Sequence, residues 1–311
     1  MSNKSELVRR LLPGIEAVLL EEAMRDTQNA RTKAQRERSL ELKEVGWLEG
    51  ELPRIAAAAF RWLDSRLDEA TAEARAQGLM VPLEASIDLL SPIGRILDER
   101  SYSQALAYLL SPSEPHALGQ GPLRAILQHI ASKSASAAPA IESVLPFLAQ
   151  ALTEPERELV SELDGQRGRT DIWIEVPASA PQLMVVMEVK VGHIITPGQL
   201  ERYEAACQRR AHELRLPPDA VVKVLLTIEG EHEAPGWTSV EWQDVAALLS
   251  FLAGSPGDGA AFLRLYLAAI LRNFYGLSSA PKSRAAKAIL LSYLRRARII
   301  SPPSPITTPH E

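Results

Sequence analysis

Apolar residues recur at helical spacing along the first quarter of the chain. Val8, Leu11, Leu12 and Ile15 begin a pattern that continues to about residue 78, through a stretch dense in charges of both signs. This pattern predicts two long amphipathic helices, which could pair as a hairpin. We therefore expect a helical N-terminal region over residues 1–90.

The middle of the chain combines helical and strand periodicity. Amphipathic helices are expected over 101–110, from Leu123 onward, and from Ile141 to Leu152. The segments that follow are expected to be strands at 158–163, 169–176, 183–191 and 220–230, a helix that starts near Pro197, and a short strand that leads into a helix after Thr238. The order helix, strand, strand, strand, helix, strand predicts an α/β core with a mixed β-sheet over residues 91–254.

The last part of the chain returns to helical spacing. Residues 260–275 and 285–300 are both amphipathic, and the second segment carries basic residues without any acid. The final segment, 301–311, is rich in proline, which is typical of disorder. We therefore expect C-terminal helices with a basic face over residues 255–300, followed by a disordered tail.

Composition limits the classes of protein that this sequence allows. The chain has 311 residues, of which 46% are hydrophobic and 23% charged, so a sizeable core is expected. Its formal net charge of -5 does not indicate a nucleic-acid binder, although an acidic chain can carry a local basic groove. The single cysteine, Cys207, excludes a disulfide within the chain and any multi-cysteine zinc or iron–sulphur site.

Neither a membrane span nor a signal peptide is predicted. The sequence contains no run of about 18 apolar residues, which is the length a spanning helix needs. Acids follow the short apolar patch near the start at once, and no small-residue cleavage site is present, so an amphipathic helix is the better interpretation. We therefore expect a cytoplasmic protein that does not associate with membranes.

The most informative segment is MEVK, residues 187–190. Side chains alternate along a strand, so Glu188 and Lys190 share one face with the apolar Met184 and Val186. A carboxylate and an ammonium at the end of an apolar strand are expected to be paired or to bind a metal, because burying a lone charge is costly. The alternative is a simple ion pair, since E-x-K is common on solvent-facing strands.

A second acid lies on the preceding predicted strand. Pairing of 169–176 with 183–191 in a hairpin would bring Asp171 beside Glu188. Two close carboxylates repel, so one keeps its proton unless a cation bridges them, and oxygen ligands of this kind suit Mg²⁺ or Mn²⁺. Such an ion activates water, and Lys190 could orient that water and stabilise negative charge. These groups together are suited to hydrolysing a phosphodiester.

The larger pattern resembles a known family. GRTDIWIE, VVMEVK and PGQLERY are similar to the PD-(D/E)XK nuclease superfamily, in its RecB-like branch, over roughly residues 95–250. The resemblance implies a restriction-endonuclease-like core in which Asp171, Glu188 and the carbonyl of Val189 bind metal and Lys190 positions the water. It also implies that Gln199 and Tyr203, the Q-x-x-x-Y signature, brace Lys190 or contact the substrate. Four residues apart, they share one helix face.

A further part of the resemblance precedes the predicted strands. DERSYSQALAYLLSPSEPHALG is similar to the entrance of a bacterial subgroup, in which a glutamate on the first core helix completes the metal site. The matching residue is Glu99, and a first-turn acid favoured by the helix dipole is the alternative. His116 and Gly119 match a His-x-x-Gly loop, where a structural histidine is the favoured interpretation. The sequence departs from the family at Thr170, where the proline of the family name is absent.

The resemblance implies nucleic acid, and first of all DNA, as the substrate. Candidate phosphate-binding groups are Arg167 and Arg169 beside Asp171, His193, and the basic stretch 282–298, for which a solvated helix face is the alternative. The N-terminal helical region suggests a homodimer or a partner protein, and a DNA-contacting arm is a second possibility.

Two other functions stay open beside that of an active nuclease. The expected role is cleavage of DNA in defence against foreign DNA or in DNA processing. A catalytically inactive scaffold of the same fold, or a nuclease subunit that depends on a partner, are the alternatives. The complete set Asp171, Glu188 and Lys190 favours activity.

Overall fold

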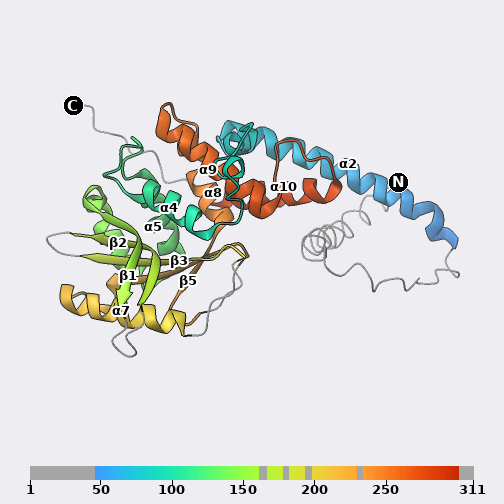
Figure 1. Cartoon of the computed structure of the whole chain (residues 1–311). Helices are drawn as coiled ribbons and strands as arrows, with labels where there is room; N and C mark the ends of the chain where they lie inside the picture. The colour runs from blue at the N-terminus through green and yellow to red at the C-terminus, as the bar shows by residue number, and fades with distance from the viewer. Residues whose placement is uncertain (1–45, 161–166, 178–181, 193–197, 230–233, 301–311) are drawn as a thin grey trace.

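The computed structural model describes residues 46–160, 167–177, 182–192, 198–229 and 234–300 (Figure 1). The first predicted N-terminal helix, His193 and the tail 301–311 lie outside these residues. The helices are α2 (Gly46–Ala76), α3 (Val81–Glu84), α4 (Glu99–Leu110), α5 (Gly121–Lys133), α6 (Ala138–Val144), α7 (Gln199–Leu214), α8 (Trp242–Ala253), α9 (Asp258–Tyr275) and α10 (Arg284–Ile299), with short 3₁₀ turns η2 (Ser91–Ile93), η3 (Leu145–Gln150) and η4 (Pro218–Ala220).

Five strands form one mixed sheet in the order β1-β2-β3-β4-β5. The strands are β1 (Leu152–Val160), β2 (Arg167–Val176), β3 (Leu183–Val189), β4 (Val221–Thr227) and β5 (Thr238–Glu241). The first three are antiparallel neighbours, whereas β3, β4 and β5 run parallel. The α/β fold with a mixed sheet flanked by helices, which the sequence predicted, is therefore confirmed.

Strand β3 lies at the centre of the sheet and is buried along its whole length. One face of the sheet packs on α7, where Trp173, Met184 and Val186 meet Cys207 and Ala211. The other face belongs to a larger core that extends through α4, α5, α8 and α9. Figure 1 shows α7 on one side of the sheet and α4 and α5 on the other. Burial on both faces explains why β3 is apolar almost throughout.

Two predicted elements differ from the structure. The helix expected from Ile141 to Leu152 stops as an α-helix at Val144, because Pro146 interrupts it and a 3₁₀ turn follows. The strand expected at 158–163 begins earlier, at Leu152. Its first half contains Pro155, which is tolerated because β1 is an edge strand. The same proline interrupts the strand pattern in the sequence, so this half was not predicted as a strand.

The basic stretch of α10 packs against other helices of the chain. α10 lies along α2 and α8, and its apolar residues join the same continuous core as the sheet. Its cationic side chains have partners: Lys287 pairs with Asp64, Arg298 with Glu73, Arg296 with Glu241 and Asp244, while Arg284 and Arg295 lie over the rings of Phe60 and Trp62. These contacts favour a structural role over the phosphate-binding role considered from the sequence. Within the described part of the chain, no helix has the length and apolarity that a membrane crossing requires.

Candidate active site

Strands β2 and β3 separate at the end of the sheet where the candidate residues lie. Their antiparallel pairing is regular up to Ile172 opposite Met187. One step further, Oδ2 of Asp171 accepts a hydrogen bond from the main-chain N–H of Val189, at 2.7 Å. In the same register Asp171 would face Glu188, so the two carboxylates lie on one face of the sheet, as the sequence predicted.

The carboxylate of Glu188 is enclosed, with only 1% of the residue exposed. Its Oε1 accepts hydrogen bonds from Nζ of Lys190 and from Nε2 of Gln199, the latter at 2.5 Å. Its Oε2 is buried and has no hydrogen-bond partner among the described residues. A buried carboxylate oxygen without a partner costs free energy, so this atom points to a ligand that the described residues do not supply.

Lys190 follows directly on β3. Its main-chain N–H donates to the carbonyl of Leu226 on β4 at 2.8 Å, which continues the parallel pairing and fixes the residue. Its ammonium donates to Glu188 and, at 3.2 Å, to Oε1 of Glu99. Burial opposes the charged ammonium, but the carboxylates of Glu188, Glu99 and Asp171 outweigh burial and raise the pKa of Lys190. The side chain is therefore a fixed cation at neutral pH.

Glu99 reaches this cluster from the first residue of α4. Its Oε2 accepts a hydrogen bond from the main-chain N–H of Val191 at 3.0 Å, while Oε1 pairs with Lys190. The end of β3 is thereby tied to α4 across the open end of the sheet. The structure thus brings together Glu99 and the three residues of the predicted site, although they come from three separate elements.

Gln199 and Tyr203 lie on one face of α7, as their spacing predicted. Nε2 of Gln199 lies 2.8 Å from the hydroxyl of Tyr203, which in turn donates to the carbonyl of Arg169 on β2 at 2.5 Å. Together they connect Glu188 on β3 to β2 beside Asp171. Gln199 contacts Oε1 of Glu188, and Lys190 contacts the same oxygen, so the amide and the ammonium meet at one carboxylate.

Burial makes both central carboxyls weak acids. It raises the pKa of Asp171 to about 6, against the lowering effect of the Val189 N–H and of Lys190. Burial and the neighbouring Asp171 raise the pKa of Glu188 to about 8, against the lowering effect of Lys190. At neutral pH the pair therefore holds a proton more readily than two exposed carboxyls, and a bound cation would displace it.

The groups present fit a hard divalent cation that keeps part of its water shell. In the described ranges no three Asp, Glu, His or Cys side chains are grouped closely enough to hold a metal ion by themselves. Asp171 and Glu188 supply two carboxylates. Both main-chain groups of a strand residue face the same neighbouring strand, so the carbonyl of Val189 lies on the Asp171 side of β3. Two carboxylates, a carbonyl and waters are oxygen donors of the kind that Mg²⁺ and Mn²⁺ bind.

Comparison with known proteins identifies the family. A sequence model described as the PD-(D/E)XK nuclease superfamily matches residues 92–250, just over half of the chain. The matched range contains Glu99, the Asp171–Glu188–Lys190 cluster and the start of α7. The chain therefore belongs to the PD-(D/E)XK nuclease superfamily. Neither a curated protein nor a solved structure matches it.

His116 has a structural role in the loop that follows α4. The main-chain N–H of Leu118 donates to its Nδ1 at 3.0 Å, so Nε2 carries the proton and donates to the carbonyl of Ser111 at 2.9 Å. The ring is almost fully buried. These two hydrogen bonds hold the loop, which agrees with the structural interpretation made from the sequence.

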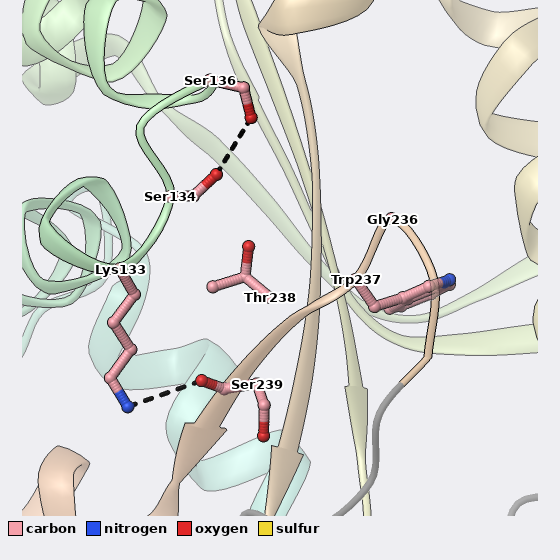
Figure 2. Close-up of a pocket in the computed structure, with 7 residues that line it drawn as sticks. All are labelled: Lys133, Ser134, Ser136, Gly236, Trp237, Thr238 and Ser239. Carbon is pink, nitrogen blue, oxygen red and sulfur yellow. Dashed lines mark hydrogen bonds between the residues drawn. The ribbon is translucent and has the colours of Figure 1, made fainter.

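A polar hollow with a volume of about 500 Å³ lies at the other edge of the sheet (Figure 2). It is lined by Lys133, Ser134, Ser136, Gly236, Trp237, Thr238 and Ser239. The ring of Trp237 points away from the serines in Figure 2, and Lys133 is engaged by Asp244 at 3.0 Å. The lining contains no acid, and β4 separates β5 from β3. This hollow is therefore separate from the Glu188 cluster and offers no carboxylate for a metal ion.

The sequence did not indicate two residues that lie beside the cluster. Glu156 lies on β1 next to Asp171, and Arg100 directly follows Glu99. Each stands in a segment rich in charged residues, where nothing in the spacing distinguishes it. The pairing of β1 with β2 reveals that Glu156 is close to the site, and the ion pair with Glu156 reveals that Arg100 faces the same group. Two arginines before Asp171 were predicted to bind phosphate. The structure describes the side chain of Arg169, on β2, whereas the side chain of Arg167 lies outside the described part of the structure.

Proposed function

We propose that this member of the superfamily is a metal-dependent deoxyribonuclease whose site is built from Asp171, Glu188 and Lys190. The observation that supports it most strongly is that Oε2 of Glu188, on the same sheet face as Asp171, is buried and has no hydrogen-bond partner within the described ranges. Such an oxygen is stabilised if a cation completes its coordination. DNA cleavage in defence against foreign DNA or in DNA processing is proposed from the family alone.

Each residue has a role that follows from its contacts. Asp171, Glu188 and the carbonyl of Val189 would hold Mg²⁺ or Mn²⁺, and Glu99 would bind the ion through a water. A bound ion would supply an acidified water and would neutralise charge on the phosphate. Lys190, a cation fixed by Glu188 and Glu99, orients the attacking water and stabilises negative charge that develops on the phosphoryl oxygens.

Gln199 and Tyr203 act through other groups. Gln199 donates to Oε1 of Glu188 and thereby fixes the orientation of its carboxylate, so that Oε2 would be the oxygen that binds the metal ion. Burial raises the pKa of the Tyr203 phenol, so the group stays a hydroxyl and donates to the Arg169 carbonyl. We propose both as positioning residues.

The test is cleavage of supercoiled plasmid, linear duplex and single-stranded DNA in Mg²⁺, Mn²⁺ or EDTA. Lys190→Ala is the diagnostic variant, with its fold checked by circular dichroism. Lys223→Ala is the matched control, because Lys223 lies on the neighbouring strand and pairs with Glu204 instead. We expect metal-dependent cutting by the wild type and by Lys223→Ala, and none by Lys190→Ala.

Other outcomes identify the alternatives. Binding of DNA without cutting in any metal would overturn the proposal of an enzyme that acts alone, and would favour a scaffold or a partner-dependent subunit. Cutting of RNA but not of DNA would keep the site and change the substrate.

A further inference from the structure

Glu156 is held in a backbone conformation that its residue type disfavours. Its φ is 53°, and among the described residues it is the one non-glycine residue inside a strand with a positive φ. The other two, Ala117 and Arg215, lie in a loop and at the C-terminal cap of α7, where left-handed residues are common. A strained residue within a strand persists only when its surroundings hold it, and such residues concentrate at functional sites.

The strand register puts Glu156 next to the candidate metal site. Pro155 pairs with Ile172 and Arg157 pairs with Thr170, so Glu156 stands opposite Asp171. The backbone thus departs from the extended form at the position on β1 that is closest in register to the candidate metal ligand.

The carboxylate of Glu156 lies between two arginines. Its Oε2 is 3.9 Å from Nε of Arg100 and 3.6 Å from a terminal nitrogen of Arg169. Arg169 also lies 3.9 Å from the exposed Glu158. Glu156 is mostly buried, with 18% of its side chain exposed, whereas the side chains of Arg100 and Arg169 are 62% and 52% exposed. One mostly buried carboxylate therefore lies within ion-pair distance of two arginines whose side chains are more than half exposed.

Both arginines neighbour residues of the site along the chain. Arg100 follows Glu99 in the first turn of α4, and Arg169 precedes Asp171 by two residues on β2. The carbonyl of Arg169 is fixed by Tyr203. Guanidinium groups match the geometry of phosphate oxygens, and a nucleic-acid strand presents a phosphate at every nucleotide.

We propose that Arg100 and Arg169 form a phosphate-binding pair that contacts the backbone of the substrate strand beside the candidate metal site, and that Glu156 is the residue that positions them. The identification of the ligand as a nucleic-acid strand rests on the proposed function. The exposed guanidinium groups turn from Glu156 toward the phosphates when the strand arrives, while Glu156 sets their spacing beforehand.

The pair is tested by the salt dependence of binding, measured in EDTA so that no cleavage occurs. The probe is a short fluorescein-labelled DNA duplex followed by fluorescence anisotropy. We expect Arg100→Ala and Arg169→Ala each to weaken binding several-fold and each to lower the slope of log affinity against log salt by about 1, with about 2 for the double variant. Arg66→Ala is the matched control, because Arg66 is similarly exposed at 49% but pairs with Glu69 on α2. Slopes equal to that of the control overturn the proposal.

The positioning role is tested by single-turnover cleavage at saturating enzyme. Glu156→Gln keeps both arginines, so we expect an unchanged salt slope but a cleavage rate about ten-fold lower, as for other residues that orient a site. Glu156→Asp keeps the carboxylate, and aspartate tolerates the left-handed conformation, so it should recover part of the rate. A wild-type rate in Glu156→Gln, or no recovery in Glu156→Asp, overturns this role. If the wild type cuts no DNA, the proposed function fails, and the salt slopes alone decide whether the arginine pair binds phosphate.

Discussion

Nε2 of Gln199 donates a hydrogen bond of 2.5 Å to Oε1 of Glu188, and so connects the first residue of α7 to the end of β3. Lys190 donates to the same oxygen. Oε1 is thus occupied twice, whereas Oε2 has no hydrogen-bond partner in the part of the chain that the structure describes. Lys190 at the end of β3 and Gln199 on the helix that follows it thus occupy the same oxygen of Glu188.

Removing the Gln199 amide should weaken metal binding without unfolding the protein. In Gln199→Ala the carboxylate of Glu188 keeps Lys190 but loses its second orienting donor. We expect the Mg²⁺ concentration for half-maximal cleavage to rise about ten-fold or more, the range found for groups that orient metal ligands. Glu201→Gln, an exposed change on the same helix, serves as the control. An unchanged Mg²⁺ requirement in Gln199→Ala would rule out the orienting role.

The two central carboxyls should make the metal-free protein less stable as the pH rises. Their pKa values in the folded protein, about 6 for Asp171 and about 8 for Glu188, lie above those of exposed carboxyls near 4. Between pH 4 and pH 8 the folded state therefore binds more protons than the unfolded state, and stability falls as the pH rises through this window.

Thermal unfolding in EDTA measures this effect. We expect the wild-type Tm to decline from pH 5 to pH 8 more steeply than the Tm of Glu188→Gln, which lacks the group with the larger shift. Mg²⁺ added at pH 8 should raise the Tm of the wild type and leave that of Glu188→Gln unchanged. Parallel pH profiles for the two proteins would contradict the raised pKa values.

The meeting of Asp171 and Glu188 was predictable because it depends on local rules. Alternation along β3 and antiparallel pairing with β2 bring the two acids to one face, and helical spacing does the same for Gln199 and Tyr203. Glu99 was predicted from the family resemblance alone. No local rule connects it to Lys190, because the two residues meet only when α4 packs against the end of the sheet.

The features that the sequence did not predict depend on contacts between segments that are distant in the chain. β1 was partly misplaced because Pro155 interrupts its strand-like pattern, and the role of Glu156 depends on the register with β2. The basic residues of α10 suggested a nucleic-acid surface, because their acidic partners lie far away in the sequence, on α2 and α8.

The loop after α4 depends on a glycine of α9. A Cβ added at Gly259 would lie 1.6 Å from the carbonyl oxygen of His116, which is main chain and cannot rotate away. Gly259→Ala should therefore displace the loop and lower stability by about 3 kcal/mol, the upper end of the usual cost of overpacking. Gly121→Ala is the control, since its Cβ meets only methyl groups of Leu252 at 3.4 Å. Equal Tm values for the two variants would show that the helix and loop can separate at little cost.

The charges of α10 should affect stability and not DNA binding. Arg296 donates to both oxygens of Asp244, at 2.6 Å and 3.0 Å, and to Glu241 at 2.7 Å. Asp244 is 1% exposed, and its pKa is held well below the usual range because hydrogen bonds from His129, Arg296 and Lys133 outweigh its burial. Arg296→Ala leaves this buried charge with fewer partners, so we expect a loss of about 3 kcal/mol.

The pairs that α10 makes with α2 are more exposed and should matter less. In the double variant Lys287→Ala, Arg298→Ala, the ion pairs with Asp64 and Glu73 are lost, each worth less than about 1 kcal/mol at the surface. Urea unfolding measures both effects. The slope of log affinity for DNA against log salt should stay at the wild-type value in this double variant, because these cations pair with acids of the chain. A slope reduced by about 2 would mean that they contact phosphates, as the sequence alone had suggested.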